Sequence, residues 1–154
     1  MRGKTETRKP VEPDSVYKSK IVAKMIQMVM ERGKKNIAEK IVYGFMAKFN
    51  EDQKEARKYF EDAVKNVMPE VEVRSRRVGG ANYQIPMPLK HERAETLALR
   101  WIVDAARSMK GKPSVEKYFE QIQMAHKGEG SAVKKKEDTH RMADANKAFA
   151  HLKW

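Results

Sequence analysis

Residues 70–89 have the sequence EVEVRSRRVGGANYQIPMPL, and their pattern differs from that of the rest of the chain. Apolar and polar residues alternate on both sides of Gly79-Gly80, which is the period of a β-strand, and a glycine pair between two such runs is typical of a hairpin turn. Pro86 and Pro88 lie two residues apart, so their missing N–H groups fall on one edge, which the outer edge of a ribbon tolerates. The sequence therefore predicts a two-stranded β-ribbon over 70–89. Because isolated ribbons are marginal in water, we expect it to lean on helices or on a partner.

Outside this stretch the apolar residues recur with helical spacing. Only a few polar residues, from Glu31 to Asn36, separate the first two apolar stripes, which indicates an antiparallel helical hairpin. We expect Ser114 to cap the fifth helix and the stripes themselves to be core rather than a cofactor site. The pattern predicts one mainly α domain over 1–154, with six helices near 21–30, 37–49, 59–67, 92–109, 115–127 and 133–148.

The composition points to a polyanionic partner. The 154 residues include 33 Lys and Arg against 21 Asp and Glu, a formal net charge of +12. Such an excess repels itself in a compact protein, and nucleic acid is its commonest partner because bound counterions are released. A basic membrane-surface protein and an ordinary basic domain are the alternatives. The absence of Cys excludes thiolate nucleophiles, disulfides and cysteine zinc sites.

The apolar runs are all too short to cross a membrane. None approaches the ~18 residues that a spanning helix needs, and the polar start of the chain does not resemble a signal peptide. We therefore expect a soluble intracellular protein with no membrane partner.

The positive charge is distributed unevenly. Residues 1–40 hold 11 basic and 5 acidic groups, whereas residues 41–69 hold 5 of each. We therefore expect the basic N-terminal arm, residues 1–13, the region after Pro69 and the C-terminal end to contact a polyanion. The locally acidic segment 51–62 is expected to face away from it.

The ribbon carries the candidate residues for nucleic-acid recognition. Arginine guanidinium groups pair with phosphates and stack on bases, amides can hydrogen-bond base edges, and tyrosine offers a stacking face. A solvated hairpin, whose charges only prevent aggregation, is the alternative. The candidates on either side of the glycine turn are Arg74, Arg76, Arg77, Asn82, Tyr83 and Gln84.

Two lysine-rich segments lie near predicted helix starts. Lys34 and Lys35 sit between the first two helices, where a helix N-terminus suits a phosphate, although an ordinary polar turn explains them equally well. Lys134, Lys135 and Lys136 are expected to open the sixth helix, where a bound phosphate would relieve their repulsion by the helix dipole. A solvated lysine face is the alternative for these three residues.

Catalytic motifs are weak. Two S-x-x-K spacings begin at Ser15 and Ser131, but their companion motifs are missing. The four histidines form no i, i+4 pair for a metal, and no phosphate-binding glycine loop is present. The sequence therefore predicts neither an enzyme nor a bound metal or cofactor.

Residues 70–89 also resemble the signature of small-subunit ribosomal protein seven, of the bacterial or organellar type. Further blocks agree with that family in order and spacing. These are Gly33-Lys34-Lys35, LALRWIV at 97–103, AVKKKED at 132–138, HRMADANKAFAH at 140–151 and the terminal Trp154. The resemblance covers nearly the whole chain and departs from the family only on variable helical surfaces and at residues 1–6.

The resemblance implies a fold and a function. Members have six helices and a protruding β-ribbon, bind the 3′ major domain of small-subunit ribosomal RNA and nucleate assembly of the head. Their ribbon borders the exit-site tRNA and the messenger RNA, and ribosomal proteins nine and eleven are expected neighbours. A basic architectural DNA-binding protein is the alternative.

The resemblance also implies a location and a set of RNA contacts. The protein is expected on the cytoplasmic ribosome, or in an organellar matrix or stroma. The family's RNA face corresponds here to Lys34, Lys35, Arg74, Arg76 and Arg77, with the arm residues Arg2, Lys4, Arg8 and Lys9. Arg141, in the last of the matching blocks, joins the expected RNA contacts.

Overall fold

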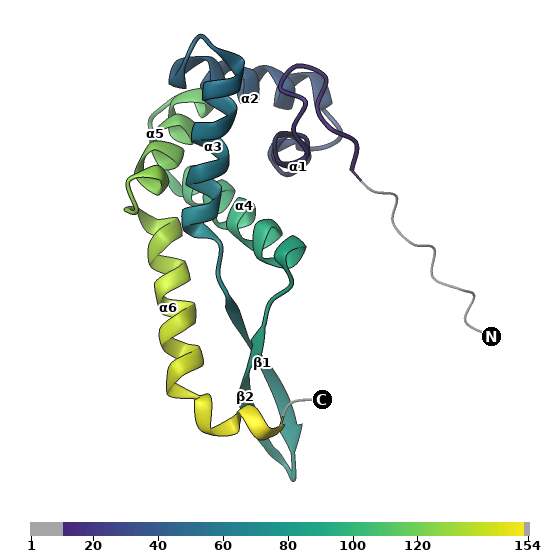
Figure 1. Cartoon of the computed structure of the whole chain (residues 1–154), viewed down its shortest axis with the longest axis vertical. Helices are drawn as coiled ribbons and strands as arrows, with labels where there is room; N and C mark the ends of the chain where they lie inside the picture. The colour runs from purple at the N-terminus through teal and green to yellow at the C-terminus, as the bar shows by residue number, and fades with distance from the viewer. Residues whose placement is uncertain (1–10, 153–154) are drawn as a thin grey trace, which may run out of the picture.

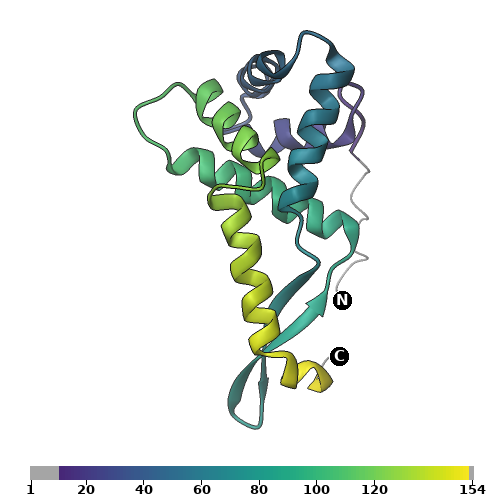
Figure 2. The same cartoon turned by 60° about the vertical axis from the view of Figure 1, so that its left-hand side comes forward.

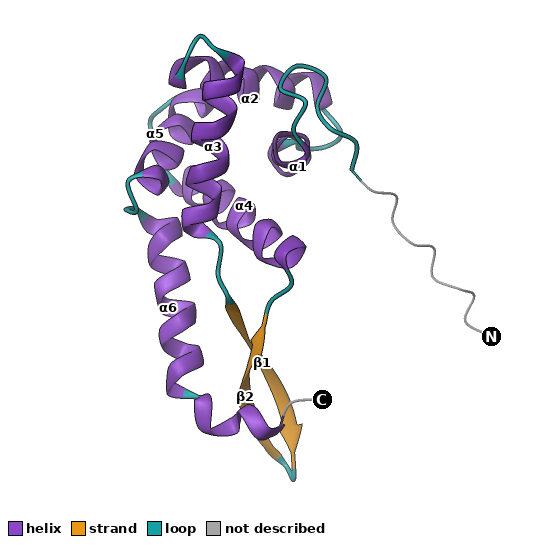
Figure 3. Ribbon diagram, in the orientation of Figure 1, coloured by secondary structure: helices purple, strands orange, loops and turns teal. Residues whose placement is uncertain are grey.

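The computed structural model describes residues 11–152, which form six α-helices, a short 3-10 helix and one two-stranded antiparallel sheet (Figures 1 and 3). This confirms the predicted mainly α fold with its ribbon. The elements, in chain order, are α1 (Lys20–Val29), α2 (Lys35–Phe49), α3 (Gln53–Val67), β1 (Val71–Val78), β2 (Ala81–Pro88), α4 (His91–Ser108), α5 (Ser114–His126), α6 (Ser131–Ala145) and η1 (Lys147–Leu152).

The core lies among α1 to α5, where the predicted apolar stripes meet, and the start of α6 adds Ala132 and Val133 to it. Phe45 of α2 and Phe60 of α3 are fully buried, with ring centroids 6.1 Å apart, and Tyr118 of α5 packs 5.9 Å from Phe45. Burying one such aromatic side chain contributes about 1.5–3 kcal/mol, so this cluster is a large part of what holds the helices together.

Three local predictions were wrong. Ser114 is the first residue of α5 and its side chain caps nothing, because Pro113 occupies the N-cap position. α6 begins at Ser131, so Lys134 to Lys136 lie beyond its first turn, and its C-terminal part ends at Ala145 before η1. In addition, α1 and α2 are not antiparallel.

The first two helices, α1 and α2, are instead steeply inclined to each other. α1 is viewed nearly end-on in Figure 1, whereas α2 runs across that view. The turn between them contains two left-handed residues, Arg32 at φ 52° and Gly33 at φ 75°. Short glycine turns can join crossing helices as well as antiparallel ones, and here α1 also packs against α4, which fixes its direction.

The ribbon has the register that a two-residue turn dictates. Gly79 and Gly80 have φ values of 56° and 89°, as a type I′ turn requires, and Val78 pairs with Ala81. Hydrogen-bonded and non-hydrogen-bonded pairs alternate from there, which places Pro86 and Pro88 at positions whose N–H would point away from β1. The predicted tolerance for these prolines is therefore confirmed.

The ribbon extends away from α1 to α5 and packs against the C-terminal part of the chain (Figure 2). α6 runs along β1, and η1 lies against β2. Glu70 N–H donates to His140 Nε2 at 3.1 Å, and the Tyr83 and Phe149 rings lie 5.1 Å apart. Ile85 is fully buried. Helices of the same chain therefore support the ribbon, which was one of the two possibilities expected, the other being support by a partner.

Candidate nucleic-acid interface

The period of two along a strand divides the predicted ribbon residues between two faces. Arg77 pairs with Asn82 across the ribbon, and Ser75 pairs with Gln84, so these four side chains share one face. All four are exposed. This face, which we call the open face, combines a guanidinium with two amides and one hydroxyl, which suits phosphate and base-edge contacts.

The opposite face carries the remaining candidates, Arg74, Arg76 and Tyr83. Arg76 Nη1 donates to the Leu152 carbonyl at 2.6 Å. The half-buried ring of Tyr83 contacts Phe149, so part of its stacking surface is covered within the protein. The six candidates therefore lie on two opposite faces of the ribbon and do not form one continuous surface. The alternation of residues along each strand already implies this division.

At the base of the ribbon, Glu72 joins β1 to α4. Its carboxylate accepts a hydrogen bond from Arg74 Nε at 2.6 Å through Oε1. Arg93 Nη2 and Nε approach Oε2 at 3.2 and 3.3 Å. Sequence reasoning missed Arg93 because nothing in its local pattern distinguishes it from other exposed helical arginines.

Lys34 and Lys35 lie at the start of α2. Lys34 occupies the N-cap position, Lys35 is the first helical residue, and no acidic side chain lies in the first turn. Both lysines are exposed, and Lys35 Nζ lies 3.5 Å from a Glu39 carboxylate oxygen. The exposed lysines at this helix end fit the predicted anion contact, while the Lys34 and Lys35 N–H groups themselves donate to the Glu31 and Gly33 carbonyls at 3.0 and 2.9 Å.

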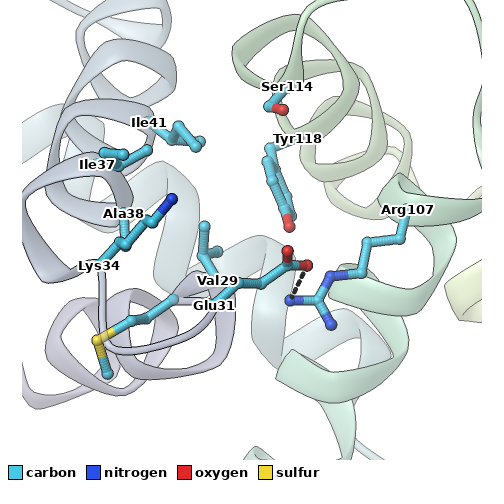
Figure 4. A pocket seen from close by; sticks show the side chains of 10 residues that line it. Val29, Glu31, Lys34, Ile37, Ala38, Ile41, Arg107, Ser114 and Tyr118 are labelled. Atoms are coloured by element: carbon cyan, nitrogen blue, oxygen red, sulfur yellow. Dashed lines mark ion pairs between the residues drawn. The ribbon is translucent and has the colours of Figure 1, made fainter.

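Beside this turn lies a pocket of about 220 Å³ between the α1–α2 turn, α4 and α5 (Figure 4). Lys34 and Ile37 line one side, and Arg107 pairs with Glu31 at 3.2 Å on the other. Burial raises the pKa of Tyr118, which also lines the pocket, and nearby Arg107 opposes that rise. Sequence reasoning did not predict this pocket, because its walls come from segments that are far apart in the chain.

The lysines of α6 are partly engaged within the protein. Lys135 Nζ lies 3.8 Å from Asp104, and Lys136 Nζ donates to the Asn66 carbonyl at 2.9 Å. Lys134 is exposed, and Arg141 pairs with Asp138 at 3.4 Å on the helix surface. Surface pairs of this kind contribute roughly 0–1 kcal/mol, so they leave these cations available to a stronger anion.

The predicted arm contacts Arg2, Lys4, Arg8 and Lys9 lie outside the described residues. Within residues 11–152, no group of three or more His, Asp or Glu side chains is arranged to hold a metal ion. Over the same residues, no helix combines the length and apolar character needed to cross a membrane.

Comparison with known proteins gives full-length matches. Residues 1–147 match the family described as ribosomal protein S7p/S5e. The small ribosomal subunit protein uS7 of Pelotomaculum thermopropionicum is 53% identical over 148 residues, covering 96% of this chain and 95% of the relative. The uS7 proteins of Thermotoga neapolitana and Pelagibacter ubique are 52% and 49% identical, over 100% and 99% of both chains. The resemblance found in the sequence is therefore confirmed.

Proposed function

The chain belongs to the ribosomal protein S7p/S5e family, and we propose that it binds the 3′ major domain of small-subunit ribosomal RNA directly and nucleates assembly of the head. The observation that carries this proposal is the protruding ribbon, whose open face presents Arg77, Asn82 and Gln84 to solvent. Cationic side chains position a protein on RNA phosphates, and the neighbouring amides can hydrogen-bond to base edges. Such a surface suits a folded RNA with irregular grooves.

Family membership itself establishes the broader role. The protein is a structural component of the ribosome and not an enzyme, as the sequence predicted. Its relatives are small-subunit proteins, which agrees with the predicted small-subunit RNA and protein partners and with a location on the cytoplasmic ribosome.

The finer assignments concern neighbours on the subunit. The ribbon extends beyond the helices and could reach past the bound RNA, which supports its placement beside the exit-site tRNA and the messenger RNA (Figure 2). Ribosomal proteins nine and eleven are the proposed protein neighbours. The lysines at the start of α2 and the ribbon form the proposed RNA face, and the basic arm, with Arg2, Lys4, Arg8 and Lys9, adds to it.

The deciding experiment measures binding of the full chain to the isolated 3′ domain transcript across a salt series, with random duplex DNA as competitor. We expect tight binding that survives excess DNA, because shape and phosphate spacing are read together. Equal and steeply salt-dependent binding to both polymers would mean that charge alone drives binding, and the proposal would fail. Preference for duplex DNA would instead favour an architectural DNA-binding protein.

A second arm of the experiment separates the 3′ domain from other ribosomal RNA. The transcript of the 5′ domain has the same charge per nucleotide and serves as the matched control. Comparable affinity for both transcripts would contradict recognition of the 3′ domain while leaving general RNA binding in place.

A further inference from the structure

The carboxylate of Glu72 connects two arginines that come from different elements. Arg74 lies two residues further along β1, and Arg93 lies on α4, 21 residues away in sequence. Arg74 approaches Oε1 through Nε at 2.6 Å and Nη2 at 2.5 Å. Arg93 approaches Oε2 through Nε at 3.3 Å and Nη2 at 3.2 Å. Each carboxylate oxygen therefore faces the side of one guanidinium.

The burial of the three groups is unequal. Glu72 is 9% exposed, whereas the side chains of Arg74 and Arg93 are 50% and 46% exposed. Each guanidinium has five N–H donors in a fixed fork, and the Nε side that faces Glu72 uses only part of them. The outer edges of both arginines, with their remaining donors, are therefore available to solvent or to a ligand.

The charge of the cluster is not balanced within it. One carboxylate faces two guanidinium groups, so a net positive charge remains on the exposed side. A second anion next to both arginines would complete the balance. The N-terminal end of α4 adjoins the base of the ribbon in Figure 1, so such an anion would lie where the proposed RNA face bends from ribbon to helices.

We infer that Glu72 is a positioning residue that holds Arg74 and Arg93 as a pair for one backbone phosphate of the RNA. This inference rests on the proposed function, and it adds Arg93 to the RNA contacts. Arginine side chains are flexible, and fixing two of them before binding avoids the entropy loss that binding would otherwise require. Two arginines at one phosphate also give a fixed orientation that single surface lysines do not.

The direction in which one substitution changes the RNA affinity distinguishes a positioning role of Glu72 from an effect of net charge alone. Glu72→Gln raises the net charge of the protein by one, so charge alone predicts equal or tighter RNA binding. Positioning predicts weaker binding, because an amide does not hold two guanidinium groups as the carboxylate does. We expect Glu72→Gln to bind the 3′ domain transcript about tenfold more weakly, the size of one lost charge-assisted hydrogen bond.

Glu70→Gln is the matched control. Glu70 precedes β1, is exposed and gives the same change of charge at the same end of the ribbon. We expect it to bind as tightly as the unchanged protein or slightly more tightly. If Glu72→Gln behaves like Glu70→Gln while the unchanged protein still prefers the 3′ domain, the positioning inference is overturned and the proposed function stands.

A second variant guards against loss of the ribbon itself. Arg93→Ala changes α4 and leaves the Arg74–Glu72 pair in place, and we expect it to weaken binding of the 3′ domain transcript about tenfold, because the phosphate then meets one guanidinium instead of two. In an Arg74→Ala and Arg93→Ala background, Glu72→Gln should no longer weaken binding. An unchanged affinity for Arg93→Ala, or continued weakening by Glu72→Gln in that background, would contradict the inference. If the unchanged protein does not prefer the ribosomal RNA, both the proposed function and this inference fail.

Discussion

At the scale of single residues, Tyr43 shows how the start of the described chain is tied to the helices. Its hydroxyl donates to Asp14 Oδ1 at 2.7 Å, and the other carboxylate oxygen accepts from Val16 N and Tyr17 N at 3.0 Å. Burial, followed by the hydrogen bond to Asp14 and the charge of Asp14, raises the pKa of Tyr43 to about 12. Sequence reasoning did not find this contact, because its partners are 29 residues apart.

This raised pKa predicts a stability loss at alkaline pH. The folded protein retains the Tyr43 proton more tightly than the unfolded chain, whose tyrosine has its ordinary pKa of 10.0. The stabilisation is therefore complete below pH 10 and is lost as the pH rises to about 12. We expect the free energy of unfolding, measured with urea, to fall more steeply over this interval in the unchanged protein than in Tyr43→Phe.

The phenylalanine variant also removes the hydrogen bond to Asp14. At neutral pH we expect it to be less stable by about 1 kcal/mol, a typical net value for one hydrogen bond. The two unfolding curves should therefore converge as the pH rises. Parallel curves would show that Tyr43 does not titrate differently in the folded and unfolded states.

At the scale of elements, the ribbon depends on η1 and α6 for its support. Tyr83 is half-buried and Ile85 is fully buried, whereas the turn at Gly79-Gly80 is exposed. The sequence predicts that the ribbon is mobile in the free protein, since glycines and prolines limit its pairing. The contacts with η1 suggest where that mobility is greatest, namely beyond Tyr83 toward the turn.

Amide hydrogen exchange tests this prediction. We expect low protection for residues near the turn and more for those near Ile85, because local opening needs few buried contacts to be broken at the tip. Phe149→Ala removes the ring that faces Tyr83 and should extend rapid exchange along β2. Met142→Ala, on an exposed part of α6, is the control and should leave the ribbon unchanged. High protection at the turn would contradict the predicted mobility.

At the scale of the whole molecule, the basic groups are not spread evenly around the fold. The net charge of +12 derives mainly from residues 1–40 and 70–112. α3 lies within the stretch 41–69, which holds equal numbers of basic and acidic groups. An RNA partner is therefore expected to meet the ribbon and the start of α2 rather than the exposed side of α3.

Two variants that each remove one positive charge test which side of the molecule meets the RNA. Arg77→Ala, on the open face of the ribbon, should weaken binding to the 3′ domain transcript and reduce the salt slope by about one unit, for one phosphate contact. Lys58→Ala, on an exposed part of α3, removes the same charge and should leave the slope unchanged. Equal effects of the two variants would indicate that only total charge matters, and would remove the assignment of the open face.

The sequence by itself determined the elements and the family. Helical spacing, the alternation over 70–89 and the glycine turn are local signals, since each depends on neighbours only a few residues away. The ribbon and the end of α3 before Pro69 were predicted for that reason. The candidate RNA contacts of the ribbon and of the α1–α2 turn were also proposed from local residue types, whereas those of the N-terminal arm were implied by the family resemblance.

Only the tertiary structure decided which of these elements and side chains meet. The inclination of α1 to α2, the support of the ribbon by η1 and the meeting of Arg74 and Arg93 at Glu72 all join segments far apart in the chain. Such contacts follow from how whole helices pack, and no local period encodes them. A carboxylate within a run of arginines has no evident partner until α4 brings Arg93 to the base of the ribbon.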